Sequence, residues 1–425
     1  MSWLLADRAD TDVVWQPPGG PPRTVGALRA AVAALRWHGV PPGGVVSIDV
    51  SEPWAGLVGV LGAISAGRVA LPSTRAVAGA SVPAHPDACL LLQTSGSSGA
   101  PRRVMLSAAG IAANVSAILG YLPLRAGQRL GVVTPLHYSY GLIGQHLVSL
   151  RAGAITVPLT PGPWAARQLD ELEGCVGVSG VPSTLAAWSR PGLPRPRLSW
   201  LASAGAPLGA ARVRAIAAAF PGATLFNQYG MTEAGPRLCA GPVSPSSPAG
   251  LVGPPVAGTE IAVVGPDGTP LPAGEEGEIV ARTPSAMLGY WQEPAATAAV
   301  LSEGWLSTGD RGRLDGAGRL CVLGRRDDLV QVGGERVSLV GVEQALLEHP
   351  QIDAAGVCPE PDDPMGRLRA VVVSAGLDRR ALVRWMRGLP PAWRPIRVLC
   401  VSALPVRPSG KLDRRALAAI HGGEP

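Results

Sequence analysis

Lysine is almost absent from this 425-residue sequence. The chain carries 37 lysine and arginine side chains, and all but one of them are arginines. The single lysine, Lys411, lies in a polar stretch near the carboxyl terminus, 405–415. An ammonium is a compact, strongly hydrated point charge, whereas a guanidinium is a broad planar fork. A lone lysine in a terminal stretch can be a solvated surface residue, or it can be the one place where a compact cation must meet anionic oxygens.

Metal-binding and disulfide patterns are also missing. The six cysteines are far apart, and none forms a CxxC pair or joins a histidine at metal spacing. Most of them sit in apolar runs, so they are predicted to be buried free thiols in a reducing cytosol. The longest apolar stretch, 57–64, is broken by glycines and far too short to span a bilayer. The start of the chain has no long apolar core, so no signal peptide is expected and a cytoplasmic location is predicted.

Charge is low and evenly spread. Charged residues make up 16% of the chain, the net charge is +6, and the arginines form no dense run interleaved with aromatic residues. Nucleic-acid binding is therefore not expected, whereas a mildly basic balance suits anionic small molecules. A length of 425 residues predicts two or three domains.

The order of patterns predicts an α/β fold followed by a smaller unit. A helix at 24–38, a strand at 45–50, a helix at 55–66 and a strand at 68–71 have the rhythm of a parallel sheet covered by helices. From residue 253 onward, short alternating segments with turn signals predict antiparallel hairpins. We expect a large N-terminal domain at 1–323, a hinge at 324–327 and a small mobile α+β domain at 328–425.

A glycine- and hydroxyl-rich loop follows the strand predicted at 88–93. It comprises Thr94, Ser95, Gly96, Ser97, Ser98 and Gly99, then Ala100-Pro101 and the cations Arg102 and Arg103. Glycines let backbone N–H groups turn toward a ligand, hydroxyls add donors and the arginines neutralise charge, so the loop suits phosphate oxygens. It lacks the GxxxxGK[ST] spacing and is not the common P-loop.

Other polar turns follow predicted strands, where open parallel sheets place their ligands. His137 and Tyr138 lie in a turn before a helix predicted at 143–150, and His137 is either a base or part of a pocket wall. Glu233 is a candidate Mg²⁺ ligand, and Tyr229 is a candidate stacking surface. Asp310 sits at a turn, where it can accept hydrogen bonds from a ribose diol.

These motifs, taken in order, resemble the adenylate-forming superfamily. That group comprises acyl- and aryl-CoA ligases, adenylation domains of peptide synthetases, and luciferases. The matching segments are 94–103, 229–233, 307–310, 324–327, 334–336 and 408–411. The resemblance implies that a carboxylate attacks the α-phosphate of ATP, giving an acyl-adenylate and pyrophosphate, before the acyl group passes to an acceptor, usually a thiol.

The resemblance also implies roles for particular residues. Thr94–Gly99 would hold the β- and γ-phosphates with Arg102, and Lys411 would bridge the substrate carboxylate and the α-phosphate. Thr232 would contact phosphate, Glu233 would carry Mg²⁺, and Arg336 would lie near phosphate or the thiol. The adenine and ribose contacts would be Gly205, Ala206, Pro207, Asn227, Tyr229, Gly230, Asp310 and Arg325. The acid pocket would contain His137, Tyr138, Gly141, Val181, Ala204, Gly230 and Ala234, and Asp327 would be the hinge.

Three departures from the family pattern stand out. Arg102 replaces the usual lysine of the glycine-rich loop, and Gln331 stands where many relatives have lysine. The region before the loop is shorter than expected, which indicates a trimmed first subdomain.

The segment 136–141 lacks the aspartate that pairs with an α-amino group and resembles the turn of acyl- and aryl-CoA ligases. An aryl or short acyl acid is therefore the predicted substrate, with CoA as acceptor. The alternatives are transfer to the phosphopantetheine of an acyl carrier protein, transfer to an amine, or a non-catalytic relative that only binds nucleotide or acyl-adenylate.

Overall fold

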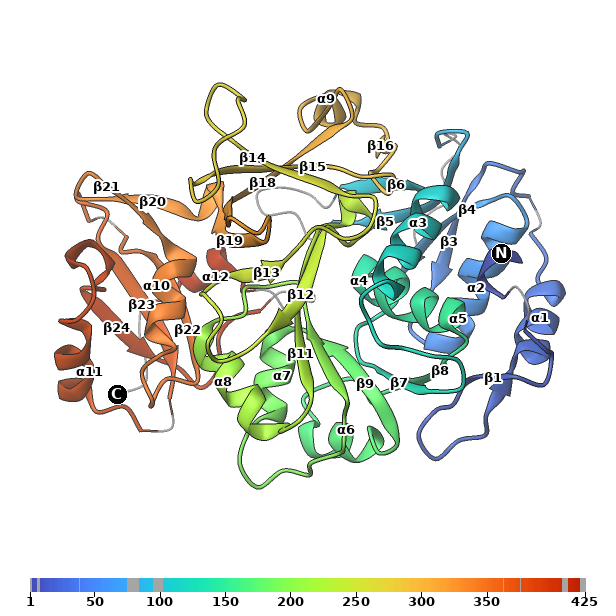
Figure 1. The fold of residues 1–425 in the computed structure, drawn as a ribbon, viewed down its shortest axis with the longest axis horizontal. Coiled ribbons are helices and arrows are strands. Elements are labelled where there is room, and N and C mark those ends of the chain that lie inside the picture. The colour runs from blue at the N-terminus through green and yellow to red at the C-terminus, as the bar shows by residue number, and fades with distance from the viewer. Residues whose placement is uncertain are drawn as a thin grey trace.

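The computed structural model describes residues 2–5, 8–37, 39–74, 84–94, 102–361, 363–374, 376–406 and 412–420, apart from the side chain of Asp327. Lys411 and Ser95–Gly99 of the glycine-rich loop therefore lie outside the described residues. The orange and red unit lies at one end of the long axis, and the blue N-terminal elements lie at the other (Figure 1).

The largest sheet is mostly parallel and brings several polar turns to one edge. Its central strands β11, β10, β9, β7, β8 and β1 are parallel, and an antiparallel strand closes each side. In spatial order the strands are β12 (Cys239–Val243), β11 (Thr224–Tyr229), β10 (Trp200–Ser203), β9 (Cys175–Gly180), β7 (Arg129–Val132), β8 (Ile155–Pro158), β1 (Val13–Trp15) and β2 (Arg23–Thr24). The loops after β7, β9, β10 and β11 follow the carboxyl ends of neighbouring parallel strands.

A second, mixed sheet carries the ends of the glycine-rich loop. Strands β3, β4 and β5 are parallel, whereas β6 and β16 run antiparallel to their neighbours. In order the strands are β16 (Gly289–Tyr290), β6 (Arg103–Ser107), β5 (Ala88–Gln93), β4 (Val69–Ser73) and β3 (Val45–Asp49). Strands β5 and β6 pair directly, so the glycine-rich segment between them connects two adjacent strands.

The third sheet is antiparallel and precedes the C-terminal unit. It contains β13 (Leu251–Gly253), β19 (Leu320–Arg325), β18 (Trp305–Leu314), β15 (Gly277–Arg282) and β14 (Glu260–Val264), and β17 (Leu301–Ser302) pairs with β18. The C-terminal unit has the hairpin β20 (Leu329–Val332) and β21 (Glu335–Ser338) and the sheet β22 (Ala354–Pro359), β23 (Leu368–Val373) and β24 (Arg397–Cys400). The predicted α/β fold class is thus confirmed, while the domain limits at 323 and 327 stay predictions.

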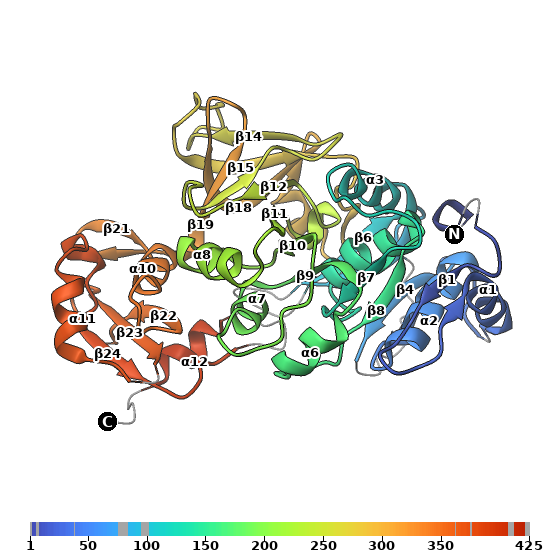
Figure 2. The same cartoon turned by 60° about the horizontal axis from the view of Figure 1, so that its bottom comes forward.

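Helices cover the sheets in layers, as Figures 1 and 2 show. Helix α3 contacts both β5 and β6 of the mixed sheet and the helical segment that packs on β8 of the large sheet, so it lies between the two sheets. The α-helices are α1 (Val25–Ala34), α2 (Pro53–Ser65), α3 (Ala108–Leu119), α4 (Ser139–Gly141), α5 (Val148–Ala152), α6 (Ala165–Glu171), α7 (Pro182–Trp188), α8 (Ala210–Ala219), α9 (Pro294–Ala298), α10 (Leu339–Leu346), α11 (Arg379–Met386) and α12 (Arg414–Ala418). Among the described residues, no helix is long and apolar enough to cross a membrane.

Two predicted helices differ from the structure. The helix predicted at 24–38 is capped by the Thr24 side chain but ends at Ala34, because Leu35 is extended and Arg36 donates hydrogen bonds to nearby carbonyl groups. The segment predicted as a helix at 143–150 is instead a π-helix, η2 (Leu142–Leu147), between α4 and α5. Hydrophobic spacing does not distinguish one wide turn from a regular helix.

The helical segment places a histidine in the main core. His146 is 2% exposed and its ring stacks on Trp15 with a centroid distance of 5.5 Å. Its Nδ1 atom has no hydrogen-bond partner within the described residues. Burial disfavours the charged imidazolium and lowers the pKa of His146 to about 3.

We predict that His146 makes the protein acid-sensitive. Below about pH 6.5 the unfolded chain protonates this histidine and the folded chain does not, so stability falls as pH drops toward the folded pKa of about 3. At pH 5 the loss attributable to His146 is about 2 kcal/mol. Denaturant unfolding at pH 7 and pH 5 should show a smaller difference for His146→Phe, whereas the exposed-site control His85→Gln should behave like wild type. Equal pH slopes for His146→Phe and wild type would contradict the prediction.

The residues just after Lys411 are anchored by a partly buried ion cluster. Arg414, the first residue of α12, donates to Asp328 at 2.9 Å, to Glu343 at 2.6 Å and to the carbonyl of Val357 at 3.0 Å. Burial raises the pKa of Glu343, and the charge of Arg414 opposes that shift. The cluster ties α12 to α10, to β22 and to the short helix η4 (Arg326–Asp328) that follows β19.

We predict that Arg414→Met destabilises the C-terminal unit by roughly 2–3 kcal/mol, because it leaves Glu343 buried without its cation. Arg415→Met is the matched control, since Arg415 is exposed and adjacent. Hydrogen exchange across α12 and α10, measured beside denaturant unfolding, should show faster exchange only for Arg414→Met. Equal protection in both variants would overturn this assignment.

Candidate active site

The base of the glycine-rich loop is closed by two hydrogen bonds. The Thr94 N–H donates to the carbonyl of Arg102 at 2.8 Å, and the Arg102 N–H donates to the Thr94 hydroxyl at 3.3 Å. Because β5 and β6 are paired neighbours, these bonds extend their ladder by one residue pair. The intervening Ser95, Gly96, Ser97, Ser98 and Gly99 lie outside the described residues, so their predicted phosphate contacts stay predictions.

Arg102, at the end of that loop, is connected through Tyr290 to Glu233, the predicted metal ligand. Its guanidinium forms an ion pair with Glu293 at 3.1 Å and lies over the ring of Tyr290 at 5.2 Å. The Tyr290 hydroxyl in turn donates to the buried Glu233 carboxylate at 2.8 Å. Burial raises the pKa of Tyr290, and the adjacent Glu233 carboxylate adds to that shift. The structure thus brings together Arg102 and Glu233, which are far apart in the sequence.

The side chains fit a magnesium ion that is completed by substrate. Within the described ranges there is no group of three or more histidine, cysteine, aspartate or glutamate side chains that could hold a metal. Mg²⁺ commonly uses one or two carboxylates and takes its other ligands from phosphates and water. Glu233 alone, at the carboxyl end of β11 and beside Arg102, matches that kind of site. When bound, the ion would neutralise charge on the phosphates.

Thr232 lies next to the predicted acid pocket. Its hydroxyl is 3.1 Å from the hydroxyl of Ser139, which follows the His137-Tyr138 turn. The rings of His137 and Tyr138 are packed with a centroid distance of 4.0 Å. Partial burial lowers the pKa of His137, which favours the neutral imidazole at pH 7. The geometry therefore suits a pocket wall, and the role of His137 as a base stays a prediction.

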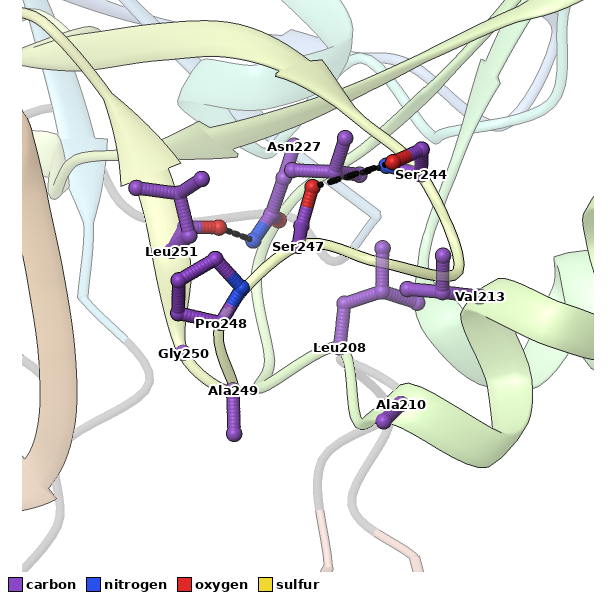
Figure 3. A pocket seen from close by; sticks show the side chains of 11 residues that line it. Leu208, Ala210, Val213, Asn227, Ser244, Ser247, Pro248, Ala249, Gly250 and Leu251 are labelled. Carbon is purple, nitrogen blue, oxygen red and sulfur yellow. Dashed lines mark hydrogen bonds between the residues drawn. The ribbon is translucent and has the colours of Figure 1, made fainter.

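The predicted adenine contacts follow two paired strands. Ser203 at the end of β10 is in register with Asn227 in β11, so the exposed turn Gly205-Ala206-Pro207 lies beside Asn227 and Tyr229. The Asn227 amide donates to the carbonyl of Leu251 at 2.7 Å. Figure 3 shows Asn227 in the wall of a small pocket with Leu208, Val213 and the segment 247–251. Asn227 therefore braces the start of β13 as well as facing this pocket.

A carboxylate joins the predicted adenine and ribose residues. The Tyr229 hydroxyl donates to Asp310 at 2.6 Å, and Arg325 forms an ion pair with the same carboxylate at 3.4 Å. Asp310 was predicted at a turn, but it lies within β18, where it is paired with Arg325 of β19. Tyr229 was predicted as a stacking surface, and the hydrogen bond from its hydroxyl to Asp310 fixes the orientation of its ring.

The residues predicted for the acid pocket differ in exposure. Val181 and Ala204 follow the adjacent strands β9 and β10, and a methyl group at Gly205 would be 3.5 Å from Val181. Ala234 is completely buried within the main core. The backbone leaves no space at two glycines, because an added Cβ would lie 2.2 Å from the Pro135 carbonyl at Gly141 and 1.8 Å from the Pro236 carbonyl at Gly230.

The C-terminal residues of the predicted site lie on a separate unit. Arg336 and Gln331 are exposed and face each other across the β20–β21 hairpin. Asp327 lies in η4 between β19 and β20, as a hinge requires. Lys411 is outside the described residues, and Leu412 after it forms a bridge with Val406. The roles of Arg336, Asp327 and Lys411 stay predictions.

Three side chains beside the predicted site carried no local sequence signal. Tyr290 and Glu293 lie about 60 residues after Glu233 in the sequence. Ser139 lies in the turn in which only His137 and Tyr138 were predicted to be site residues. The aromatic and acidic residues of 290–293 occur in no motif. Their position is set by the pairing of β16 with β6.

The fold and the site define the class of nucleotide-using enzymes that activate a carboxylate. Residues 73–291 match the family described as AMP-binding enzyme, and residues 341–411 match its C-terminal domain. The chain belongs to the AMP-binding enzyme family, and it is an adenylate-forming ligase. The resemblance inferred from the motifs is thereby confirmed.

Particular relatives show the spread of this family. A feruloyl-CoA synthase from an Amycolatopsis species is 34% identical over 337 residues, covering 77% of this chain and 68% of the relative. A sulfoacetate–CoA ligase from Cupriavidus necator is 33% identical, covering 82% and 70%. An L-proline–[L-prolyl-carrier protein] ligase from Pseudomonas fluorescens is 33% identical, covering 78% and 68%. ATP-bound MatB from Rhodopseudomonas palustris has the same fold, with a TM-score of 0.86 at 23% identity over 98% of both chains.

We predict that Tyr290 positions Glu233. Tyr290→Phe keeps the ring but removes the hydroxyl that holds the buried carboxylate at 2.8 Å. The Mg²⁺ concentration needed for half-maximal ATP–pyrophosphate exchange should rise about 10-fold, the size expected for losing a residue that orients a metal ligand. The KM for the acid should stay unchanged, which serves as the internal control. An unchanged Mg²⁺ dependence would show that Tyr290 does not orient Glu233.

Proposed function

We propose that this ligase activates an aryl or short acyl carboxylic acid as an acyl-adenylate and transfers the acyl group to the thiol of CoA. The observation that supports it most is the convergence of Thr232, Glu233 and Tyr229 at the end of β11. Around that point lie the closed base of the glycine-rich loop, the Asp310–Arg325 pair and the His137 turn. Residues predicted to contact phosphate, ribose and the acid come from different sheets and are linked to the end of β11 through Tyr290, Asp310 and Ser139, which supports the proposal.

Electrostatic stabilisation accounts for the roles of the cations. The reaction brings an anionic carboxylate against an anionic α-phosphate while charge grows on the phosphate oxygens and the leaving pyrophosphate, and fixed positive groups that face these oxygens lower the barrier. Arg102 is held by Glu293 and Tyr290 at the loop base, where it would neutralise the outer phosphates. Lys411 would supply the compact cation that fits between the two reacting groups.

Two features favour an acid without an α-amino group. The turn 136–141 offers His137 and two tyrosines instead of an acidic partner for an ammonium. A feruloyl-CoA synthase and a sulfoacetate–CoA ligase, which are named for acids without such a group, are similar over more than three quarters of this chain.

A carrier protein is the specific alternative to CoA as the acyl acceptor. A similar L-proline–[L-prolyl-carrier protein] ligase is named for transfer to a carrier protein, whose phosphopantetheine arm ends in a thiol like that of CoA. The exposed pair Gln331 and Arg336 on the β20–β21 hairpin would contact the acceptor, and Gln331 replaces a lysine that is common in the family.

One experiment separates these reactions. Pyrophosphate release is measured with ATP, Mg²⁺ and a panel of aryl and short acyl acids, first without acceptor and then with CoA, a phosphopantetheinylated carrier protein or an amine. We expect sustained turnover with CoA and only slow turnover without an acceptor. Faster turnover with a carrier protein or an amine would replace CoA as the acceptor, and pyrophosphate release with none of the acids would favour a binding protein without catalysis.

We predict that Lys411→Ala lowers the rate of acyl-adenylate formation by about two to three orders of magnitude, as removal of a transition-state charge does in other enzymes. The acid-dependent exchange of pyrophosphate into ATP measures this step directly. Arg415→Ala, four residues away on the same segment and exposed, should exchange at the wild-type rate. A Lys411→Ala enzyme that matched wild type would remove Lys411 from the mechanism.

A further inference from the structure

Arg237 is a buried arginine without a counterion. Its side chain is 2% exposed, and its Nε and Nη2 atoms have no hydrogen-bond partner among the described residues. Arg369 is the comparable case, because it is also fully buried. Arg369 also has two nitrogens, Nε and Nη1, without a hydrogen-bond partner, but its Nε lies 3.9 Å from the Glu360 carboxylate and its Nη2 donates to the carbonyl of Ala418. In the part of the chain that the structure describes, no carboxylate pairs with Arg237 in this way.

The backbone of Arg237 is held in place on both sides. Its N–H donates to the side-chain oxygen of Asn114 at 3.1 Å, and its carbonyl accepts from the Asn114 amide at 2.9 Å. The Asn114 amide also donates to Ser285 at 2.9 Å. This double contact with α3 fixes where the arginine side chain starts, so its burial is built into the fold.

The guanidinium lies behind the predicted acid pocket. Its central carbon is 5.3 Å from the ring centroid of Tyr140, whose hydroxyl approaches the carbonyls of Gly180 and Ala202 at 3.5 Å. Those carbonyls belong to the carboxyl ends of β9 and β10. Tyr140 follows the His137-Tyr138-Ser139 turn, and the Cα atom of Arg237 is 3.1 Å from the position of a Cβ added to Gly230.

The guanidinium is enclosed by uncharged neighbours. A Cβ added at Gly144 of the π-helix would be 3.6 Å from Nη2, so the glycine keeps side-chain atoms away from that nitrogen. Tyr121 is a second neighbour, because burial raises the pKa of its phenol and the nearby Arg237 opposes that shift; the phenol also accepts a hydrogen bond from Gln228 at 2.8 Å. Tyr140 and Tyr121 are neutral at pH 7, so they supply no negative charge to Arg237.

We propose that Arg237 is a specificity-determining residue that receives a second carboxylate of the substrate, at the end remote from the carboxylate that is activated. This inference rests on the proposed function and narrows its substrate class to dicarboxylic acids. A buried charge without a partner is unfavourable in the empty protein, and such violations are expected at functional sites. A carboxylate can accept two parallel hydrogen bonds from a guanidinium, which would use the two unpartnered nitrogens.

The competing assignment is purely structural. A guanidinium over an aromatic ring is a favourable contact, and Arg237 over Tyr140 would then serve the packing of the two sheets. The two assignments differ in what happens when the charge is removed. A structural cation should stabilise the protein whatever the ligand, whereas a ligand-binding cation should reduce the stability of the empty protein.

The catalytic test compares acids that differ in one group. Wild type and Arg237→Met are assayed by pyrophosphate release with terephthalate against 4-methylbenzoate, and with succinate against butyrate. In at least one pair we expect the wild type to favour the dicarboxylate about 100-fold or more in kcat/KM, mostly through KM, because a site built around a polar group rejects an analogue that lacks it. Arg237→Met should lose that preference while keeping or gaining activity on the monocarboxylate.

Thermal unfolding tests the role of Arg237 even if the Arg237→Met variant has lost its ligase activity. Without ligand, Arg237→Met should unfold at a higher temperature than wild type, whereas Arg369→Met, which removes a partnered cation, should unfold at a lower one. The preferred dicarboxylate should raise the unfolding temperature of wild type and leave that of Arg237→Met unchanged.

Two failures are distinguishable. If no acid in the panel supports pyrophosphate release, the proposed function fails, and the thermal shift with dicarboxylate alone still decides the role of Arg237. If the wild type uses monocarboxylates equally well, or if Arg237→Met keeps the dicarboxylate preference, the assignment of Arg237 is overturned and the ligase activity stands.

Discussion

The carboxylate of Asp310 connects the parts of the site that belong to different sheets. It accepts the Tyr229 hydroxyl from the end of β11 and pairs with Arg325 at the end of β19. Arg325 directly precedes η4, from which the C-terminal unit begins. One acidic side chain thus holds the large sheet, the antiparallel sheet and the start of the connection in a fixed relation. The shape of a nucleotide site at the end of β11 would therefore depend on how Asp310 holds the two sheets together.

Sequence patterns identified the features that are local. Strand β5 and the strand–helix–strand order of residues 45–71 were predicted because a few consecutive residues determine each element. The π-helix was not predicted, since hydrophobic spacing does not distinguish one wide turn from a regular helix. Tyr290 and Arg237 were missed for a different reason. Their partners come from distant segments, so nothing in their own neighbourhood sets them apart.

The contacts that the arginine side chains make explain why this protein uses arginine for nearly all of its cations. Arg102 combines an ion pair with ring contact, and Arg414 donates to three acceptors at once. A planar group with five donors suits such divided contacts, whereas an ammonium suits a single crowded point. The preference therefore follows from what each cation has to reach. It agrees with the role proposed for Lys411, the single lysine of the sequence.

Helix α8 of the large domain has its N-terminus capped from the C-terminal unit. Gly209 offers no side-chain cap, and the Ala211 N–H donates instead to Glu348 at 2.9 Å, with Arg214 pairing to the same carboxylate. Gln344 packs so closely that a side chain at Gly209 would collide with it. If the C-terminal unit turned about the predicted hinge, the Ala211 N–H would lose Glu348 and would bind water instead. The stability of one helix is thereby linked to domain orientation, so the relative population of the two orientations would respond to salt and to the charge of a single glutamate.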